Sequence, residues 1–234
     1  MAIEQFKKFP FHQAIFVCGL LGYFSVFLLV GRIIYSGSYM YSFLIWNLFL
    51  AIVPLFVSFT AHRLYFFRRI NRHCIYLLFF VWLIFFPNAL YIITDFIHLR
   101  IRGNVPLWYD LILVFAFVWN GLIIGFLSLR IMHKIIEDMA GKIIGWVFAC
   151  VSLLLSGFGV YVGRFLRWNS WDIISQPHHL FLDVLDRLFN PARHPRTYIM
   201  SLILWLFFFL AYVMIMSINE AEVKFWHNKK EKKF

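Results

Sequence analysis

The segment Phe86–His98 places Asn88, Tyr91, Asp95 and His98 within an otherwise apolar run. Carboxyl and imidazole groups are the ordinary agents of proton transfer, and both also bind metals. In a helix, Tyr91, Asp95 and His98 share one face because they are spaced i, i+4 and i+7. We therefore interpret Asp95 and His98 as candidate catalytic residues. Asn88 and Tyr91 are candidates for binding a substrate.

A second polar group lies in Pro106-Leu107-Trp108-Tyr109-Asp110. Asp110 is a third candidate catalytic residue, and Trp108 and Tyr109 are candidates for substrate binding. Proline near a helix start and an acid in the first turn are also ordinary helix-start signals. That explanation accounts for Asp110 as well as a catalytic role does, so both stay open.

A third polar group follows Gly163, where Arg164 and Arg167 are spaced to project from one helix face. The planar guanidinium group of arginine binds carboxylate and phosphate through two hydrogen bonds. We predict that both arginines bind a substrate phosphate. The remaining candidate substrate-binding residues are Trp168, Asn169 and Asp172.

The composition identifies the environment of these groups. Of the 234 residues, 62% are hydrophobic and only 14% charged, which excludes an ordinary soluble domain. Six apolar runs approach or exceed the roughly 20 residues that cross a bilayer. They are 13–35, 42–61, 73–99, 107–132, 143–162 and 198–217. The sequence therefore predicts one integral membrane domain over 1–234, an all-α polytopic transmembrane helical bundle, and gives no indication of nucleic-acid binding.

The third run contains Pro87 next to Asn88. Proline removes a backbone donor and clashes with the preceding turn, so we expect a kink or a break there. An ionisable side chain such as that of Asp95, in hydrocarbon, costs about 2.5 to 3.5 kcal/mol and is usually functional. We therefore expect the Pro-broken third helix to line a cavity or to pack against protein.

Basic residues predict the orientation. With six spans, 14 of the 22 lysines and arginines fall on the side of the termini, including every lysine, and the other eight are all arginines. Basic loops are retained in the cytoplasm, so both termini are predicted to be cytoplasmic in a plasma membrane. Residues 219–234 then form a basic cytoplasmic tail.

The long connection 164–197 is predicted to be extracytoplasmic. Within it, His178–Phe189 alternates leucine and phenylalanine with charged residues at helical spacing, between Pro177 and Pro191. This pattern predicts an amphipathic helix lying at the outer membrane interface.

Topology places the three polar groups on the same outer side, which predicts an outward-facing polar pocket. The alternative is that Asp95 pairs with Arg164 or Arg167 only to join helices, because buried ion pairs can be structural.

These polar groups also resemble a known family. Phe86-Pro87-Asn88-Ala89 with Tyr91, Thr94-Asp95 and His98, then Pro106–Asp110, then Gly163-Arg164-Phe165-Leu166-Arg167-Trp168-Asn169-Ser170-Trp171-Asp172 resemble the bacterial membrane-protein family called domain of unknown function 1361. The resemblance implies a polytopic plasma-membrane protein of bacterial origin, and it implies no activity.

Two function classes stay open. The first is a membrane-embedded enzyme acting on a lipid or lipid-linked phosphate, with Asp95 or Asp110 as base or metal ligand and His98 as acid, base or ligand. A divalent metal is the one cofactor considered, with His178, His179 and His194 as further ligands. The second is a non-catalytic lipid-binding, transport or scaffold protein whose arginines bind an anionic headgroup. Whether the chain is an enzyme stays undecided at this level.

Overall fold

The computed structural model describes residues 11–67, 72–101 and 104–231. Within these ranges every regular element is a helix, and six helices are long and apolar enough to cross a membrane. They are Gln13–Ser36, Phe43–Phe66, His73–His98, Leu107–Ala140, Lys142–Phe165 and Pro195–Ile218. The all-α polytopic fold is therefore confirmed, and most span boundaries lie close to those predicted.

The fourth span differs most from its prediction because its helix continues to Ala140 instead of ending near Met132. The added residues include charged side chains that were assigned to a loop, but lysine and glutamate are good helix formers. The helix ends at Gly141, whose φ of 95° lies in the left-handed region that glycine adopts without a steric penalty.

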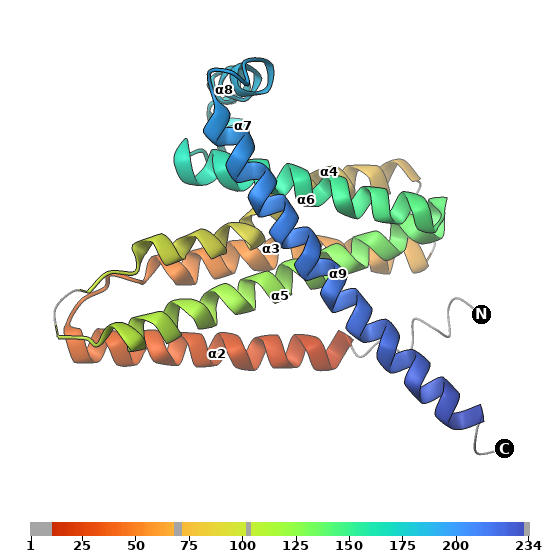
Figure 1. The fold of residues 1–234 in the computed structure, drawn as a ribbon, viewed down its shortest axis with the longest axis horizontal. Helices are drawn as coiled ribbons and strands as arrows, with labels where there is room; N and C mark the ends of the chain where they lie inside the picture. The colour runs from red at the N-terminus through yellow and green to blue at the C-terminus, as the bar shows by residue number, and fades with distance from the viewer. Residues whose placement is uncertain (1–10, 68–71, 102–103, 232–234) are drawn as a thin grey trace. The chain divides into compact units, whose positions relative to one another are not determined.

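The chain forms two compact units, residues 1–135 and 136–234. The first unit contains α2 (Phe11–Ser36), α3 (Phe43–Phe66), α4 (Arg72–Tyr91), the 3-10 helix η1 (Ile92–His98) and most of α5 (Leu107–Ala140) (Figure 1). The single domain predicted from the sequence stays a prediction.

Helix α5 is the core helix of the first unit. About two-thirds of the residues in its most apolar stretch are buried. In α2 the corresponding fraction is 17%, and α2 exposes a row of large apolar side chains. The buried Trp82 indole of α4 donates a hydrogen bond to Ser128 Oγ of α5 at 2.6 Å. A polar link of this kind fixes the register of two helices where apolar contacts alone leave it loose.

Helix α4 passes through Pro87 without ending, and the change in helix type comes after Tyr91. From Ile92 to His98 the chain is a 3-10 helix with three residues per turn. The predicted common face of Tyr91, Asp95 and His98 assumed 3.6 residues per turn. The observed geometry instead aligns Ile92, Asp95 and His98, and the first two are fully buried.

The second unit contains α6 (Lys142–Phe165), α7 (Asp172–Ser175), α8 (Pro177–Phe189) and α9 (Pro195–Glu231). Helices α6 and α9 pack closely at Gly157, where a Cβ atom would lie 2.6 Å from the backbone oxygen of Ser201. Helix α9 continues through most of the predicted basic tail, of which 232–234 lie outside the described residues, as do Lys7 and Lys8.

The predicted amphipathic helix is present as α8. In Figure 1 it is seen nearly end-on, whereas α9 runs across the picture, so α8 lies across the direction of α9. A helix that crosses the direction of a membrane span is oriented to lie along a membrane surface. The side of the membrane on which it lies stays a prediction.

Candidate functional site

A buried ion pair joins the end of α2 to the start of α5. Arg32 Nε donates to Asp110 Oδ1 at 2.7 Å and Arg32 Nη2 donates to Asp110 Oδ2 at 3.2 Å. The side chains are each only 2% exposed. This two-point geometry is the strongest that arginine forms with a carboxylate. The pair holds two helices together at one end of the first unit.

The chain around Arg32 supplies further partners. The Tyr41 ring lies under the guanidinium group, with Arg32 Cζ 4.6 Å from its centroid, and Tyr41 is fully buried. Arg32 Nη1 makes long contacts of 3.5 Å to Ser36 Oγ and to the Ser38 carbonyl oxygen. The cation therefore meets carboxylate, aromatic and carbonyl groups at once, which compensates its removal from water.

Asp110 was predicted as a catalytic residue, and its two carboxylate oxygens are both bonded to Arg32. A buried, two-point arginine–carboxylate pair that joins two helices is commonly structural, so this geometry favours the structural explanation that the sequence left open. Arg32 itself was not singled out from the sequence. The available signal was an arginine three residues before the end of the predicted membrane-spanning run 13–35, a position that usually requires a partner.

Asp95 lies in η1 and is 1% exposed. Asn47 Nδ2 of α3 donates to Asp95 Oδ2 at 2.7 Å. Close approach of η1 to α5 sets this position, because Gly121 leaves room for Ile92, whose Cγ2 would lie 2.6 Å from an added Cβ. Asn47 is a second residue that sequence reasoning missed, although an amide within an apolar helix commonly joins helices.

His98 ends η1 one 3-10 turn beyond Asp95 and is exposed. Its ring meets the Phe43 ring edge-on with centroids 5.0 Å apart, and its backbone oxygen accepts a hydrogen bond from the Tyr41 hydroxyl at 3.3 Å. A buried carboxylate and an exposed imidazole thus share one short helix. Both are groups of the kind that general acids and bases use, one buried away from water and one exposed to it.

The other predicted residues of the first unit lie in the last turns of α4 and in the first turn of α5. Asn88 and Tyr91 are half-buried in the last turns of α4. Trp108 is mostly exposed, while the Tyr109 hydroxyl donates to the Leu28 carbonyl oxygen of α2 at 2.8 Å. Tyr109 therefore has a structural partner, and Trp108 is placed to meet lipid or ligand.

In the second unit, the predicted residues after α6 form a tight local structure. Arg167 is exposed with φ of 63°, and Trp168 Nε1 donates to Asp183 Oδ2 of α8 at 2.8 Å. Asp172 Oδ2 accepts from the Asn169 backbone N–H at 2.7 Å and Oδ1 accepts from the Ser175 hydroxyl at 2.9 Å. These contacts fold the connection back toward α8.

Arg164 lies half-buried in the last turn of α6. The predicted pairing of Asp95 with Arg164 or Arg167 joins residues of different units and stays a prediction, as does the outward-facing pocket. Buried polar groups also occur near the other end of α5, where Arg130 and His133 are 8% and 2% exposed. The concentration of polar groups at one end, on which the pocket prediction depended, is thus weaker than the sequence suggested.

Within the part of the chain that the structure describes, no three histidine, cysteine, aspartate or glutamate side chains gather as metal ligands. Of the histidines predicted as further ligands, His194 Nε2 lies 2.6 Å from Asp186 Oδ2, and His178 and His179 pack edge-on with ring centroids 5.8 Å apart.

Asp172 makes the connection between α6 and α8 sensitive to acid. The hydrogen bond from the Asn169 backbone N–H, helped by those from the Ser175 and Asn169 side chains, lowers the pKa of Asp172 below its ordinary 3.8 against the opposing effect of burial. A lowered pKa means stability that is present above the unfolded-state value and lost as pH falls through the folded-state value.

We therefore expect amide hydrogen exchange over 168–175, corrected for the intrinsic rate at each pH, to accelerate as pH falls below about 4. In Asp172→Asn the titrating group is gone, so this acceleration should disappear. A matched change, Asp138→Asn on an exposed turn of α5, should leave it intact. Equal acceleration in wild type and Asp172→Asn would contradict this explanation.

Comparison with known proteins adds a family and no activity. A search of curated proteins and a search of solved structures found no match. The sequence profile of a family described as "Protein of unknown function (DUF1361)" matches residues 46–215, which include η1, the start of α5 and the connection after α6. The chain belongs to this family.

Proposed function

We propose that the protein is a membrane-embedded enzyme that acts on a lipid or lipid-linked phosphate at the outer face of the plasma membrane. The observation that carries this proposal is the environment of Asp95. This carboxyl group is 1% exposed in a 3-10 segment, bonded to Asn47, and one turn from the exposed His98. Ionisable groups are rarely retained at such positions without a function.

The proposed chemistry is phosphate-ester hydrolysis or transfer. Such a step needs a base to accept the proton of the attacking hydroxyl and an acid to protonate the leaving oxygen. In this proposal Asp95 is the base and His98 is the acid. Asp110 is assigned neither role, because its two bonds to Arg32 form a buried pair that joins α2 to α5.

A second candidate function is non-catalytic binding of a lipid headgroup. It is favoured by the bonds of Asp110 to Arg32 and of Asp95 to Asn47, because each carboxylate already has a partner that satisfies it. In this case both carboxylates hold the helix ends in place, and ligand contacts come from exposed groups such as Trp108 and His98.

Turnover of a phosphate ester separates the two functions. Full-length protein would be incubated with phosphatidic acid, phosphatidylglycerol and a prenyl diphosphate, with and without an added alcohol acceptor, and the products identified by mass spectrometry. A hydrolase should release inorganic phosphate from phosphatidic acid or the prenyl diphosphate, or glycerol or glycerol phosphate from phosphatidylglycerol, whereas a transferase should form a new phosphate ester of the acceptor. We expect Asp95→Asn and His98→Ala each to lower the rate by about 100-fold or more, the usual contribution of a general acid or base.

Asp138→Asn and His73→Ala are the matched controls, because they remove the same groups from exposed positions in α5 and α4. Their rates should stay at the wild-type level. Wild-type protein that turns over no probe but retains one of these lipids through purification, and loses it in His98→Ala, would instead support non-catalytic binding.

A further inference from the structure

The acidic side chains of the connection between α6 and α9 all have partners within it. Asp172 is bonded to Asn169 and Ser175, and Asp183 accepts from the Trp168 indole. Asp186 lies against His194 and accepts from Asn190 Nδ2 at 2.7 Å. These hydrogen bonds lower the pKa of Asp186, that from His194 most of all, so the carboxylate stays charged and internally bonded.

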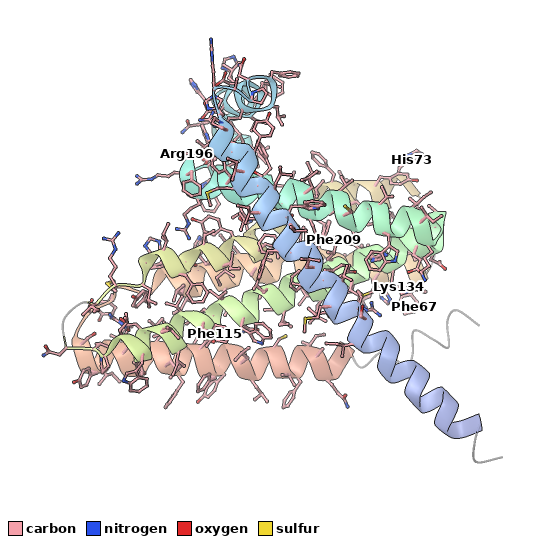
Figure 2. All side chains as sticks on the ribbon, in the orientation of Figure 1. Phe67, His73, Phe115, Lys134, Arg196 and Phe209 are labelled. Atoms are coloured by element: carbon pink, nitrogen blue, oxygen red, sulfur yellow. The ribbon has the colours of Figure 1, made fainter. Side chains whose placement is uncertain are left out.

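The arginines of this connection and of the first turn of α9 are less fully paired than its acidic residues. Arg187 pairs with Asp183, with Nη1 3.6 Å from Oδ1, within α8. Arg167, Arg193 and Arg196 are exposed and form no hydrogen bond or ion pair with the described residues of the second unit. Figure 2 shows Arg196 at the start of α9, with other nitrogen-tipped side chains projecting around the same end of the unit. Three cationic groups thus remain available to an external anion.

An apolar surface accompanies these cations on α8. Its exposed large side chains are Phe181, Leu182, Leu188 and Phe189. In water such a face is costly, whereas a helix lying in the headgroup region of a bilayer buries it in lipid. Because α8 lies across the direction of the membrane span α9, its length is oriented to follow a membrane surface.

Specific bonds hold the arginines beside this helix. The Trp168 indole bond to Asp183 ties the segment that carries Arg167 to the middle of α8. At the other end, the Tyr198 hydroxyl of α9 donates to the carbonyl oxygens of Arg187 and Leu188 at 2.7 and 2.9 Å. These bonds restrain the turn between α8 and α9, whose backbone carries Arg193 and Arg196.

We propose that α8 and the exposed arginines Arg167, Arg193 and Arg196 form a binding surface for anionic phospholipids of the surrounding leaflet. The apolar face of α8 enters the acyl boundary, and the guanidinium groups bind lipid phosphates, to which arginine donates through two N–H groups. Arg167 was also predicted to bind a substrate phosphate, but the surface uses no residue assigned to proton transfer, so failure of the proposed enzyme would leave this inference standing.

Lipid retention tests the surface. Full-length protein would be purified from mixed micelles containing equal phosphatidylcholine and phosphatidylglycerol, and the bound lipids measured by mass spectrometry. We expect wild-type protein to be enriched in phosphatidylglycerol. Each basic residue near an anionic surface contributes about 1 kcal/mol, or roughly fivefold, so the triple variant Arg167→Gln/Arg193→Gln/Arg196→Gln should lose most of the enrichment.

Two controls make the result specific. Arg100→Gln removes an exposed arginine beyond the end of η1 in the first unit and should keep the enrichment. The triple change to lysine retains charge but not the paired donors, so it should keep part of it. Full enrichment in the glutamine variant would overturn the proposal. So would a wild-type dimer that the glutamine variant converts to a monomer without change in bound lipid, because the surface would then bind a second copy.

Discussion

Arg32→Ala should destabilise the protein by about 3 to 5 kcal/mol, because it leaves the Asp110 carboxylate buried without its cation. The loss also removes the partner of the Tyr41 ring, which adds to the effect. Thermal or denaturant unfolding of the purified protein in detergent measures it. Asp110→Asn should show a similar but smaller loss, since an amide oxygen still accepts one of the two N–H groups.

The double variant Arg32→Met/Asp110→Leu tests whether Arg32 and Asp110 stabilise the protein as a pair or contribute separately. Replacing both charges with apolar side chains leaves no unpaired buried group, so the double variant should be more stable than Arg32→Ala alone. Arg100→Gln, at an exposed position, should change stability by less than about 0.5 kcal/mol. If the stability lost in the double variant equalled the sum of the losses caused by the two single changes, the two residues would not be a coupled pair.

Helix content and membrane spans could be predicted from the sequence because both depend on local patterns of apolar residues. An irregularity in the third span was also predicted, but at Pro87, and α4 runs through that proline; the change to a 3-10 helix comes after Tyr91. Whether the chain kinks at the proline or changes to a 3-10 helix several residues later depends on packing of Ile92 against Gly121, which no local pattern contains.

The partners of the candidate site were the least predictable part. Asp95 and Asp110 were recognised because charge in an apolar run is conspicuous, but Asn47 and Arg32 lie 48 and 78 residues away from them in sequence. Pairing over such separations depends on which helices become neighbours. Trp168, by contrast, was predicted to bind a substrate, and its indole bond to Asp183 shows that it also holds two segments of the chain together.

Gly157→Ala should separate α6 from α9 and cost about 1 to 3 kcal/mol, the usual penalty for overfilling a packed interface. A Cβ atom at residue 157 would lie 2.6 Å from the Ser201 backbone oxygen and 3.2 Å from the Trp205 backbone nitrogen. Backbone atoms cannot turn aside as a side chain can, so the two helices must move apart along their contact. Unfolding in detergent, followed with hydrogen exchange over α9, measures both the loss of stability and where it occurs.

Gly19→Ala is the matched control, because Gly19 lies in α2 with nothing within 4 Å of an added Cβ. Alanine is favoured over glycine in a helix by about 1 kcal/mol, so this variant should be as stable as wild type or slightly more stable. The same propensity gain acts in Gly157→Ala, so the difference in stability between the two variants, rather than the net loss in Gly157→Ala, measures the steric clash. Equal stability of the two variants would show that α6 and α9 do not depend on this close approach.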